Sequence, residues 1–554
     1  MKIRVQVTLR IEGMTCDGCA RHVTEALKSV AGVEEATVSN WQSGKAQAIV
    51  GPNVADQELI DAVARAGYHA VVLERKPLQK GRRAPKVKGA DFDLFIVGGG
   101  SAAFSAAIKG AELGAKVAIV EKGMIGGTCV NIGCVPSKTL IRAAELCYRS
   151  AYPHFEGLAA CPPPSDWARV IQQKDELVAS LREGKYVHVA ESYPNISIIK
   201  GEARLMGKGS VSVNGKSHAA GKILIATGAH PWTPPIPGLA EAGYLDSTDA
   251  LSLPALPKSM IVIGGGAVGL ELGQLFTRFG VRVMLLEGGI QIAPGEDPEI
   301  GTALARYLQE EKMQINTGAR VIRVEKGEDG YRVDAEVAGA SRTFTAEQLL
   351  VTTGRRPTTE GFGLEEAGVK LGRRGEVLVN EHLQTANPDI SAAGDVLGDP
   401  MFVYVAGYAG GLAAENALTG IGRVYDLSTL PRVTFTDPQI ASVGLTESQA
   451  REKGLSIRTT TLELKNVPRA IAARNTRGLI KLVAEEGTGK LLGTHVLAAE
   501  GGEIIQEATL AIRFGLTTQD LIGTFHPYLT MAEGLKLAAL TFDKDVQKLS
   551  CCAT

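Results

Sequence analysis

The stretch Phe92-Asp93-Leu94-Phe95-Ile96-Val97-Gly98-Gly99-Gly100-Ser101-Ala102-Ala103 decides the fold of this 554-residue chain. Its apolar first half predicts a buried strand, and an alanine-rich helix and a second strand over residues 116–120, ending at Glu121, follow the glycines. Glycines at such a turn let the backbone approach a pyrophosphate, and the acidic residue can accept the ribose hydroxyls. The stretch therefore predicts a dinucleotide-binding unit whose contacts come from Gly98, Gly100, Ala103 and Glu121.

The same pattern recurs later in the chain. Residues 260–263 predict a strand that leads into Gly264-Gly265-Gly266-Ala267-Val268-Gly269, then a helix, then a strand over residues 282–286 that ends at Glu287. Two such units in one chain predict two bound dinucleotides. In the second unit the expected contacts are Gly264, Gly266, Gly269 and Glu287.

Six of the eight cysteines form three close pairs, namely Cys16 with Cys19, Cys129 with Cys134, and Cys551 with Cys552. Adjacent cysteines such as Cys551 and Cys552 can hardly bridge each other without strain, whereas two thiolates on a chain end suit a soft metal ion. In the cytosol, cysteine pairs are more often metal-binding or catalytic than structural. A structural disulfide remains the alternative for Cys129 and Cys134, and a thioredoxin-like redox pair for Cys16 and Cys19.

Residues 1–73 read as a small separate domain. Alternating apolar residues predict a strand over 5–11, and helical spacing predicts a helix containing Val23 and Leu27. Strands over 33–38 and 46–50, a helix over 55–66 and a last strand over 68–73 complete a βαββαβ order, the ferredoxin-like plan. Cys16 and Cys19 come at the start of the first helix, where the helix dipole favours thiolate.

Composition limits the other function classes. The formal net charge is −1 at pH 7, with 45% hydrophobic and 21% charged residues, which is typical of globular proteins and gives no sign of a nucleic-acid partner. No apolar run is long enough to cross a bilayer, and the N-terminus lacks the apolar stretch of a signal peptide. We therefore expect a cytoplasmic protein that is not embedded in a membrane.

Two resemblances to known families follow from these motifs. Residues 1–73, with Met14-Thr15-Cys16-Asp17-Gly18-Cys19, resemble the heavy-metal-associated domain of copper chaperones and metal-transport ATPases. Residues 91–550 resemble the flavoprotein disulfide reductase family, to which glutathione reductase and lipoamide dehydrogenase belong. This second resemblance rests on both glycine motifs, Cys129-x4-Cys134, Ala226-Thr227-Gly228, Thr353-Gly354-Arg355-Arg356-Pro357 and Ala393-Gly394-Asp395.

The second resemblance implies a role for each of several residues. The first glycine unit would bind FAD and the second NAD(P)H, with Asp395 on the flavin ribitol, Lys138 near the flavin N5 and Glu271 beside the transfer path. Cys134 would lie next to the flavin, Cys129 would be the exchange thiol, and a helix beginning at Pro136 and Ser137 would favour the thiolate. Further FAD contacts are implied for Thr128, Thr227 and Gly228.

The C-terminal part of the chain indicates which members of the flavoprotein disulfide reductase family it resembles. Disulfide-reducing members end in a His-Pro-Thr-x-x-Glu motif, whose histidine protonates the departing thiolate. Here the matching stretch is Tyr528-Leu529-Thr530-Met531-Ala532-Glu533, and His526 lies two residues too early. With the Cys551-Cys552 tail and the N-terminal metal domain, the whole chain resembles the mercuric ion reductase family.

That resemblance implies reduction of Hg²⁺ to volatile Hg⁰ by a homodimer. The tail of one subunit would reach the flavin of the other, and Tyr186, Tyr528 and Glu533 would belong to the site. The implied partners are mercury–thiol complexes and a membrane mercury transporter as donor. The implied metal ligands are Cys16, Cys19, Cys129, Cys134, Cys551 and Cys552.

The electron donor is the point at which the chain departs from the family. The family's usual donor is NADPH, but a carboxylate at Glu287 prefers a free ribose 2′-hydroxyl and repels a 2′-phosphate. Arg282 or Arg356 could compensate for that repulsion, so we expect NADPH and keep NADH as the alternative.

Two other functions remain open. One is a dithiol or disulfide oxidoreductase of the lipoamide dehydrogenase type, which the displaced histidine and the cysteine tail disfavour. The other is a non-enzymatic soft-metal-binding protein, which the intact Cys129-x4-Cys134 pair and both glycine motifs disfavour.

The predicted fold is α/β, with two Rossmann-like dinucleotide-binding domains and an α+β dimerisation domain, preceded by the ferredoxin-like domain. The predicted boundaries are 1–73 for the heavy-metal-associated domain, 74–90 for a basic linker, 91–250 for the first part of the FAD-binding domain, 251–370 for the NAD(P)H-binding domain, 371–430 for the second part of the FAD-binding domain, and 431–554 for the dimerisation domain with its tail.

Overall fold

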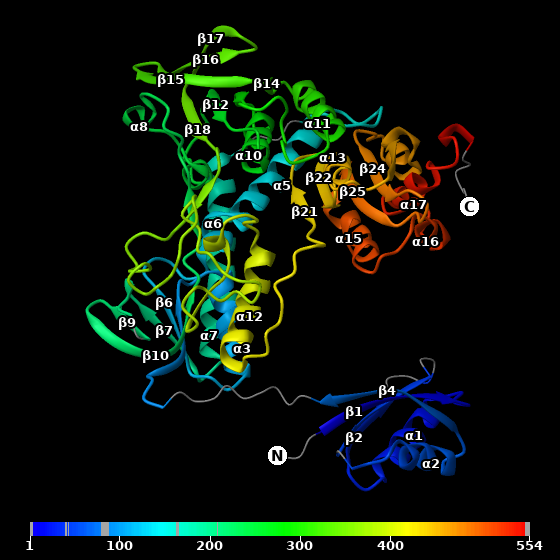
Figure 1. Ribbon diagram of the computed structural model, residues 1–554. Coiled ribbons are helices and arrows are strands. Elements are labelled where there is room, and N and C mark those ends of the chain that lie inside the picture. Colours follow the sequence, from blue (N-terminus) through cyan, green and yellow to red (C-terminus); the bar gives the residue numbers. More distant parts are fainter. Residues whose placement is uncertain are drawn as a thin grey trace. The chain divides into compact units, whose positions relative to one another are not determined.

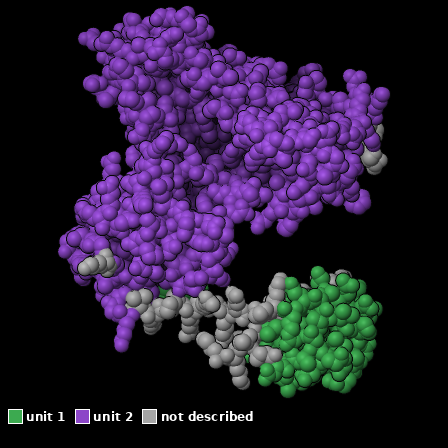
Figure 2. Space-filling view, in the orientation of Figure 1, with its two compact units in different colours: residues 1–85, 112–115 green, residues 86–111, 116–554 purple. Residues whose placement is uncertain are grey.

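The computed structural model describes residues 4–38, 41, 44–51, 53–78, 88–161, 166–207 and 209–548. The Cys551-Cys552 tail and most of the predicted linker therefore lie outside the described residues. The chain divides into two compact units, one of residues 1–85 with 112–115 and the other of residues 86–111 with 116–554 (Figure 2). Each unit is described by itself.

The first unit has the predicted βαββαβ order. Its antiparallel sheet has the strand order β2-β3-β1-β4, and its two helices pack on one face of that sheet (Figure 1). The alternating Val5, Val7, Leu9 and Ile11 of β1 are all buried, as the period of two requires for a strand with one face on the core. The elements are β1 (Arg4–Glu12), α1 (Asp17–Lys28), β2 (Val33–Val38), β3 (Lys45–Val50), α2 (Asp56–Arg65) and β4 (His69–Leu78).

The last strand of this unit differs from its prediction. It begins at His69 rather than Tyr68 and runs to Leu78, five residues past the predicted end at Leu73. The reason is that β4 pairs with the whole of β1, as far as Arg4 opposite Leu78. Backbone pairing thus extends the strand into a polar stretch that has no apolar pattern of its own.

The second unit begins with a parallel sheet in which β7, β6, β5, β10 and β20 lie side by side, and β9 and β8 extend it in antiparallel fashion. Helices α3 and α12 lie against this sheet (Figure 1). The elements are β5 (Phe92–Val97), α3 (Ser101–Glu112), β6 (Val117–Glu121), α4 (Gly127–Ile132), α5 (Cys134–Ala151), α6 (Trp167–Arg182), η1 (Glu183–Val187), α7 (His188–Glu191), β7 (Ile196–Lys200), β8 (Ala203–Leu205), β9 (Ser210–Val213), β10 (Lys216–Ile225), β11 (Ala229–Pro231), β20 (Ile390–Ala392), η2 (Asp395–Leu397) and α12 (Val403–Thr419).

A second parallel sheet, of order β14-β13-β12-β18, carries the second glycine motif, and an antiparallel three-stranded sheet β15-β16-β17 accompanies it. Phe276 of α10 is fully buried beneath this sheet, a burial that contributes roughly 2–3 kcal/mol. The elements are α8 (Leu239–Ala242), α9 (Ser247–Ala250), β12 (Ser259–Ile263), α10 (Ala267–Arg278), β13 (Arg282–Leu286), α11 (Pro298–Glu310), β14 (Gln314–Asn316), β15 (Ala319–Gly327), β16 (Gly330–Val337), β17 (Ala340–Ala346), β18 (Gln348–Val351) and β19 (Arg355–Pro357).

The C-terminal part folds around an antiparallel sheet of order β21-β22-β25-β24-β23. Its elements are β21 (Arg432–Thr434), β22 (Gln439–Gly444), α13 (Glu447–Glu452), β23 (Ile457–Glu463), η3 (Leu464–Asn466), α14 (Pro468–Ala472), β24 (Leu479–Glu485), β25 (Leu491–Ala498), α15 (Gly501–Arg513), α16 (Thr518–Gly523), α17 (Glu533–Leu540) and η4 (Val546–Lys548). Within the described ranges, no helix is long and apolar enough to cross a membrane.

Candidate active site

The glycine turn after β5 is closed too tightly for a side chain. Gly98 has a φ of +116°, and a Cβ there would lie 2.2 Å from the carbonyl oxygen of Ala226. Glu121, at the end of β6, accepts hydrogen bonds from the backbone N–H of Gly99 (2.7 Å) and of Gly123 (2.7 Å). The turn therefore presents bare backbone and a fixed carboxylate side by side, as a dinucleotide site requires.

The segment that carries Cys129 and Cys134 rests on this turn. The N–H of Gly126 donates to the carbonyl of Gly99 (2.8 Å), and a Cβ on Gly127 would lie 2.6 Å from the Cα of Gly100. Helix α4, with Thr128 and Cys129, starts at that contact. A dinucleotide on the turn would therefore lie next to Cys129.

Cys129 and Cys134 are brought together where α4 meets α5, and both are free, partly buried thiols. Helix α5 begins at Cys134 itself, two residues before the predicted start, so the sulfur is at the first position of the helix. The hydrogen bond from the Cys129 thiol and the nearby charge of Lys138 lower the pKa of Cys134 to about 7, against burial and Glu271. The pKa of Cys129 is raised because its thiol donates that bond and because it is buried.

Lys138 and Glu271 hold three parts of the second unit at this point. The Lys138 ammonium lies 2.6 Å from Glu271 Oε2 on α10 and 4.7 Å from the ring centre of Phe435. The other oxygen of Glu271 accepts the N–H of Phe435 (2.9 Å), and its side chain is 8% exposed. This contact joins α5, α10 and the residue after β21 beside Cys134.

Tyr186 reaches the same place from η1, a π-helical turn, a type of turn that is frequent at functional sites. Its ring packs edge-on against Phe104 at 4.9 Å, and its hydroxyl lies 3.3 Å from Ser101 Oγ. Burial, together with the charges of Cys129 and Cys134, raises its pKa, so the hydroxyl keeps its proton at neutral pH.

The residues around the first turn fit FAD. Gly394 brings η2 to α3, since a Cβ there would lie 3.0 Å from that of Ala102. Asp395 is partly buried, and this burial raises its pKa. The positive charge of Arg355 opposes part of that rise. Thr227 Oγ1 donates to the carbonyl of Thr358 (2.6 Å), and Gly228 takes a φ of +72°. These features match the parts of a flavin dinucleotide. The glycine turn offers bare backbone, Glu121 lies where a ribose would bind, and Asp395 lies near the start of α3.

The second turn repeats this arrangement. Gly264 has a φ of +110°, and a Cβ there would lie 2.7 Å from the carbonyl of Thr352. A Cβ on Gly269 would lie 2.0 Å from the carbonyl of Gly264, and Gly266 caps α10. These residues fit a nicotinamide dinucleotide in the same way.

The N-terminal pair forms a separate site. The Cys16 and Cys19 sulfurs lie 3.2 Å apart at the start of α1, and the pair is accessible to solvent. The backbone of Thr15, then Tyr68 and Cys16, lower the pKa of Cys19 to about 6. In the described part of the chain, no group of three or more His, Cys, Asp or Glu residues could hold a metal ion, so the described metal candidates are cysteine pairs.

The remaining predicted residues lie elsewhere. Tyr528 is half-exposed on the loop between α16 and α17, and Glu533 starts α17 with one carboxylate oxygen buried and without a hydrogen-bond partner among the described residues. His526 is bonded to Glu507 (2.7 Å). The structure thus brings together Cys129, Cys134, Lys138, Glu271 and Tyr186, and leaves Tyr528 and Glu533 on the C-terminal sheet domain.

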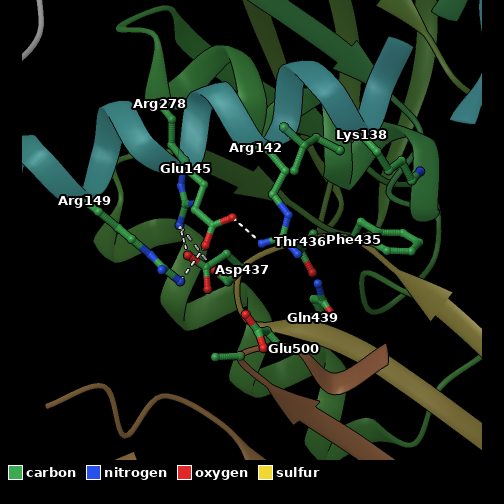
Figure 3. A pocket seen from close by; sticks show the side chains of 12 residues that line it. Lys138, Arg142, Glu145, Arg149, Arg278, Phe435, Thr436, Asp437, Gln439 and Glu500 are labelled. Atoms are coloured by element: carbon green, nitrogen blue, oxygen red, sulfur yellow. Dashed lines mark hydrogen bonds and ion pairs between the residues drawn. The ribbon is translucent and has the colours of Figure 1, made fainter. Parts of the chain in front are cut away.

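A pocket of about 130 Å³ opens beside Lys138, between α5 and the segment after β21 (Figure 3). Its lining carries four cations and three carboxylates, namely Lys138, Arg142, Arg149 and Arg278 with Glu145, Asp437 and Glu500. Arg142 and Arg149 both pair with Glu145, and Arg278 pairs with Asp437 at 3.0 Å (Figure 3). Both pairs of Glu145 lie within α5, whereas the Arg278–Asp437 pair joins α10 to the segment after β21.

Three contacts of these sites were not anticipated from the sequence. Tyr68 beside Cys19, Phe435 beneath Lys138 and Arg355 opposite Asp395 each join segments distant in the chain. Arg355 stood in a motif already singled out, whereas no role in a site was predicted for Tyr68 or Phe435. For Tyr68 and Phe435, no local pattern distinguishes them from packing aromatics.

Comparison with known proteins agrees with this geometry. A family model described as "Pyridine nucleotide-disulphide oxidoreductase" matches residues 92–410. The mercuric reductase of Staphylococcus aureus is 47% identical over 546 residues, covering 98% of each chain. The chain belongs to the mercuric reductases of the pyridine nucleotide-disulphide oxidoreductase family. Membership in this family implies FAD and NAD(P)H.

Other matches cover the rest of the chain. The model of the dimerisation domain of the same family matches residues 430–539, and that of the heavy-metal-associated domain matches residues 8–69. The mercuric reductase of Shigella flexneri is 41% identical, covering 99% of this chain and 100% of its own. Among solved structures, the HOCl-induced flavoprotein disulfide reductase RclA from Escherichia coli matches with a TM-score of 0.73 and 33% identity, covering 82% of this chain and all of its own.

Proposed function

We propose that this enzyme reduces Hg²⁺ to Hg⁰ with a hydride from NAD(P)H. The balance is one Hg²⁺ and one NAD(P)H giving one Hg⁰, one NAD(P)⁺ and one proton. The observation that carries the proposal is the Cys129–Cys134 pair on the glycine turn, with a thiolate-forming Cys134 beside Lys138. Similarity to curated mercuric reductases over 98% of the chain supports the choice of metal.

The thiols of the chain would carry the ion. Soft thiolates match a soft ion, so Hg²⁺ can pass between cysteine pairs without leaving sulfur. Cys16 and Cys19 would collect it, Cys551 and Cys552 of the partner subunit would receive it, and Cys129 and Cys134 would hold it for reduction. FAD, held by the glycine turn, Glu121 and Asp395, would supply the two-electron chemistry that links NAD(P)H to the metal ion. Neutral mercury then leaves because thiolates bind the cation and not the atom.

The remaining residues would position these groups. Lys138 would keep Cys134 ionised, and Glu271 would hold Lys138 in place. Tyr186, protonated at neutral pH, and Tyr528 of the partner subunit would line the ion's path; Glu533 would support the loop that carries that tyrosine. We propose a homodimer whose subunits share each site, working in the cytoplasm, where NAD(P)H and thiol-bound mercury are available. A membrane mercury transporter is the proposed source of the ion.

The test is donor oxidation under anaerobic conditions with Hg²⁺ in excess thiol, with mercury vapour collected from the headspace. Donor oxidation matched one to one by vapour is the expected result. Turnover of lipoamide or glutathione disulfide in place of metal-dependent oxidation would contradict the proposal.

A further inference from the structure

The carboxylate at the end of β13 is fixed by two backbone groups. Glu287 Oε2 accepts the N–H of Gly265 in the glycine turn (2.6 Å), and Oε1 accepts the N–H of Gly289 (2.6 Å). A Cβ on Gly265 would lie 3.0 Å from Glu287 Oε2, so the carboxylate stands directly against the turn. It cannot swing aside without losing both bonds.

The first dinucleotide-binding unit, which ends at Glu121, contains the same arrangement. Glu121 accepts from Gly99 and Gly123 at 2.7 Å each, with the same spacing in sequence, and a Cβ on Gly99 would lie 3.0 Å from Glu121 Oε2. FAD, which that unit fits, has an adenosine ribose with free 2′ and 3′ hydroxyls. The second dinucleotide-binding unit thus has the same carboxylate arrangement as the first. That arrangement suits a ribose without a 2′-phosphate.

Among the described residues, Glu287 forms no salt bridge within 4.0 Å, and the cations considered for it have other partners or lie at a distance. Residues 288–297, which follow it, contain neither lysine nor arginine. Arg282 is exposed at the opposite end of β13, roughly 15 Å away along a strand. Arg356 stacks on Trp232 at 4.8 Å, and Arg320, the next cation along β15, is paired with Glu336. The two arginines that could have compensated are therefore either distant or engaged elsewhere.

We propose that the second dinucleotide-binding unit selects NADH over NADPH, and that Glu287 is the residue that rejects the 2′-phosphate. The inference rests on the proposed function only in taking the second dinucleotide-binding unit as the nicotinamide nucleotide site. A carboxylate fixed by two N–H groups accepts the 2′-hydroxyl as donor, whereas a phosphate offers no donor and adds negative charge. The usual donor of the family is therefore the poorer one for this chain.

The test is equilibrium binding to the FAD-loaded full chain, measured by calorimetry with ADP-ribose and with 2′-phospho-ADP-ribose, neither of which can reduce the flavin. ADP-ribose should bind at least about tenfold more tightly, the ratio expected for a phosphate dianion a few ångströms from a carboxylate in solvent. In Glu287→Gln this ratio should fall below about threefold, with the FAD content unchanged because Glu121 serves the other unit.

Glu328→Gln is the matched control, since it removes the same charge from an exposed turn of the same domain at the far end of β15. It should keep the wild-type ratio. Ile290, 93% exposed beside Glu287, offers a second variant, and Ile290→Arg should strengthen binding of 2′-phospho-ADP-ribose. Equal or tighter binding of 2′-phospho-ADP-ribose by the wild type, or no binding of either ligand, would overturn the proposal. A tenfold preference without mercury turnover would leave it standing and contradict only the proposed metal chemistry.

Discussion

Cys16 and Cys19 lie at the solvent-exposed start of a helix in the N-terminal unit, whereas Cys129 and Cys134 lie partly buried against a glycine turn in the larger one. In the exposed pair, hydrogen bonds from the backbone of Thr15, the Tyr68 hydroxyl and Cys16 are the main causes that lower the pKa of Cys19 to about 6. In the buried pair, one thiol donates to the other and Lys138 stands beside it, so one pKa falls to about 7 and the other rises.

In the proposed function, this difference separates capture of the metal ion from its reduction. An exposed pair with a ready thiolate can take up a soft ion from a thiol that meets it, and the described residues of its own unit contain no dinucleotide turn that could supply electrons. The buried pair is asymmetric, and the turn beneath it fits a flavin dinucleotide. The proposed task of each pair therefore rests on its surroundings more than on the Cys-x-x-Cys or Cys-x4-Cys spacing.

The strongest way to break this comparison is to remove a buried thiol. Cys134→Ser should lower metal-dependent donor oxidation by roughly 10³-fold or more, as loss of a reacting group does in other enzymes. The assay is anaerobic oxidation of the donor with Hg²⁺ in excess thiol. Cys147→Ser, on the same helix, is the control and should keep full activity. Activity within tenfold of wild type in Cys134→Ser would assign reduction to another site.

Removing the tail thiols tests how the ion reaches the buried pair. Cys551→Ala with Cys552→Ala should slow turnover of dithiol-bound mercury at least about tenfold, because a tethered ligand acts at a high effective concentration. Anaerobic reduction of the flavin by the donor should be unchanged, which is the internal control. Full turnover in this variant would exclude the relay.

Lys138 sharpens the comparison, because no lysine is among the main causes of the low pKa of Cys19. Its positive charge lowers the pKa of Cys134, so Lys138→Met should raise that pKa by roughly one pH unit. The thiolate fraction at pH 7 would then fall from about one half to about one tenth, and the loss would be recovered above pH 8.

The measurement for Lys138 is the pH dependence of alkylation of the reduced protein, read by mass spectrometry on the Cys134 peptide. Lys138→Arg keeps the charge and should restore the midpoint near 7. Lys453→Met, an exposed lysine of the C-terminal domain, should change nothing. An unmoved midpoint in Lys138→Met would show that the bond from Cys129 alone sets the pKa.

The smallest effect is expected at the exposed pair. Tyr68→Phe removes one hydrogen bond to the Cys19 thiolate, so the pKa of Cys19 should rise from about 6 while the backbone bond of Thr15 persists. Alkylation of Cys19 against pH would report the shift. Turnover with excess mercury should be unaltered, and a midpoint that stays near 6 would leave Tyr68 without a role in the pair.

Much of this architecture could be predicted from the sequence, because its signals are local. The strand at residues 282–286 ends at Leu286 as the apolar pattern indicates, and Gly98 and Gly264 take positive φ at the turns their motifs predict. The cysteine pairs also follow from spacing alone.

The rest depends on contacts between distant segments. Strand β4 extends to Leu78 because β1 pairs with it, and no pattern in residues 74–78 announces this. Tyr68 reaches Cys19, and Phe435 reaches Lys138, only through tertiary packing. The sequence suggested Arg282 and Arg356 as possible ligands of a 2′-phosphate. Their positions in the fold argue against this role, which the sequence alone could not show.

The central claim is that the buried pair reduces the metal and the exposed pair only gathers it. The most direct test is the anaerobic vapour assay on the full chain with Cys16→Ala and Cys19→Ala, run beside the wild type under saturating thiol-bound Hg²⁺. We predict one mercury atom released per donor oxidised in both proteins, at rates within about twofold, since surface residues away from a site rarely change its chemistry. Loss of mercury release in the variant, with its flavin still reduced by the donor, would contradict the account.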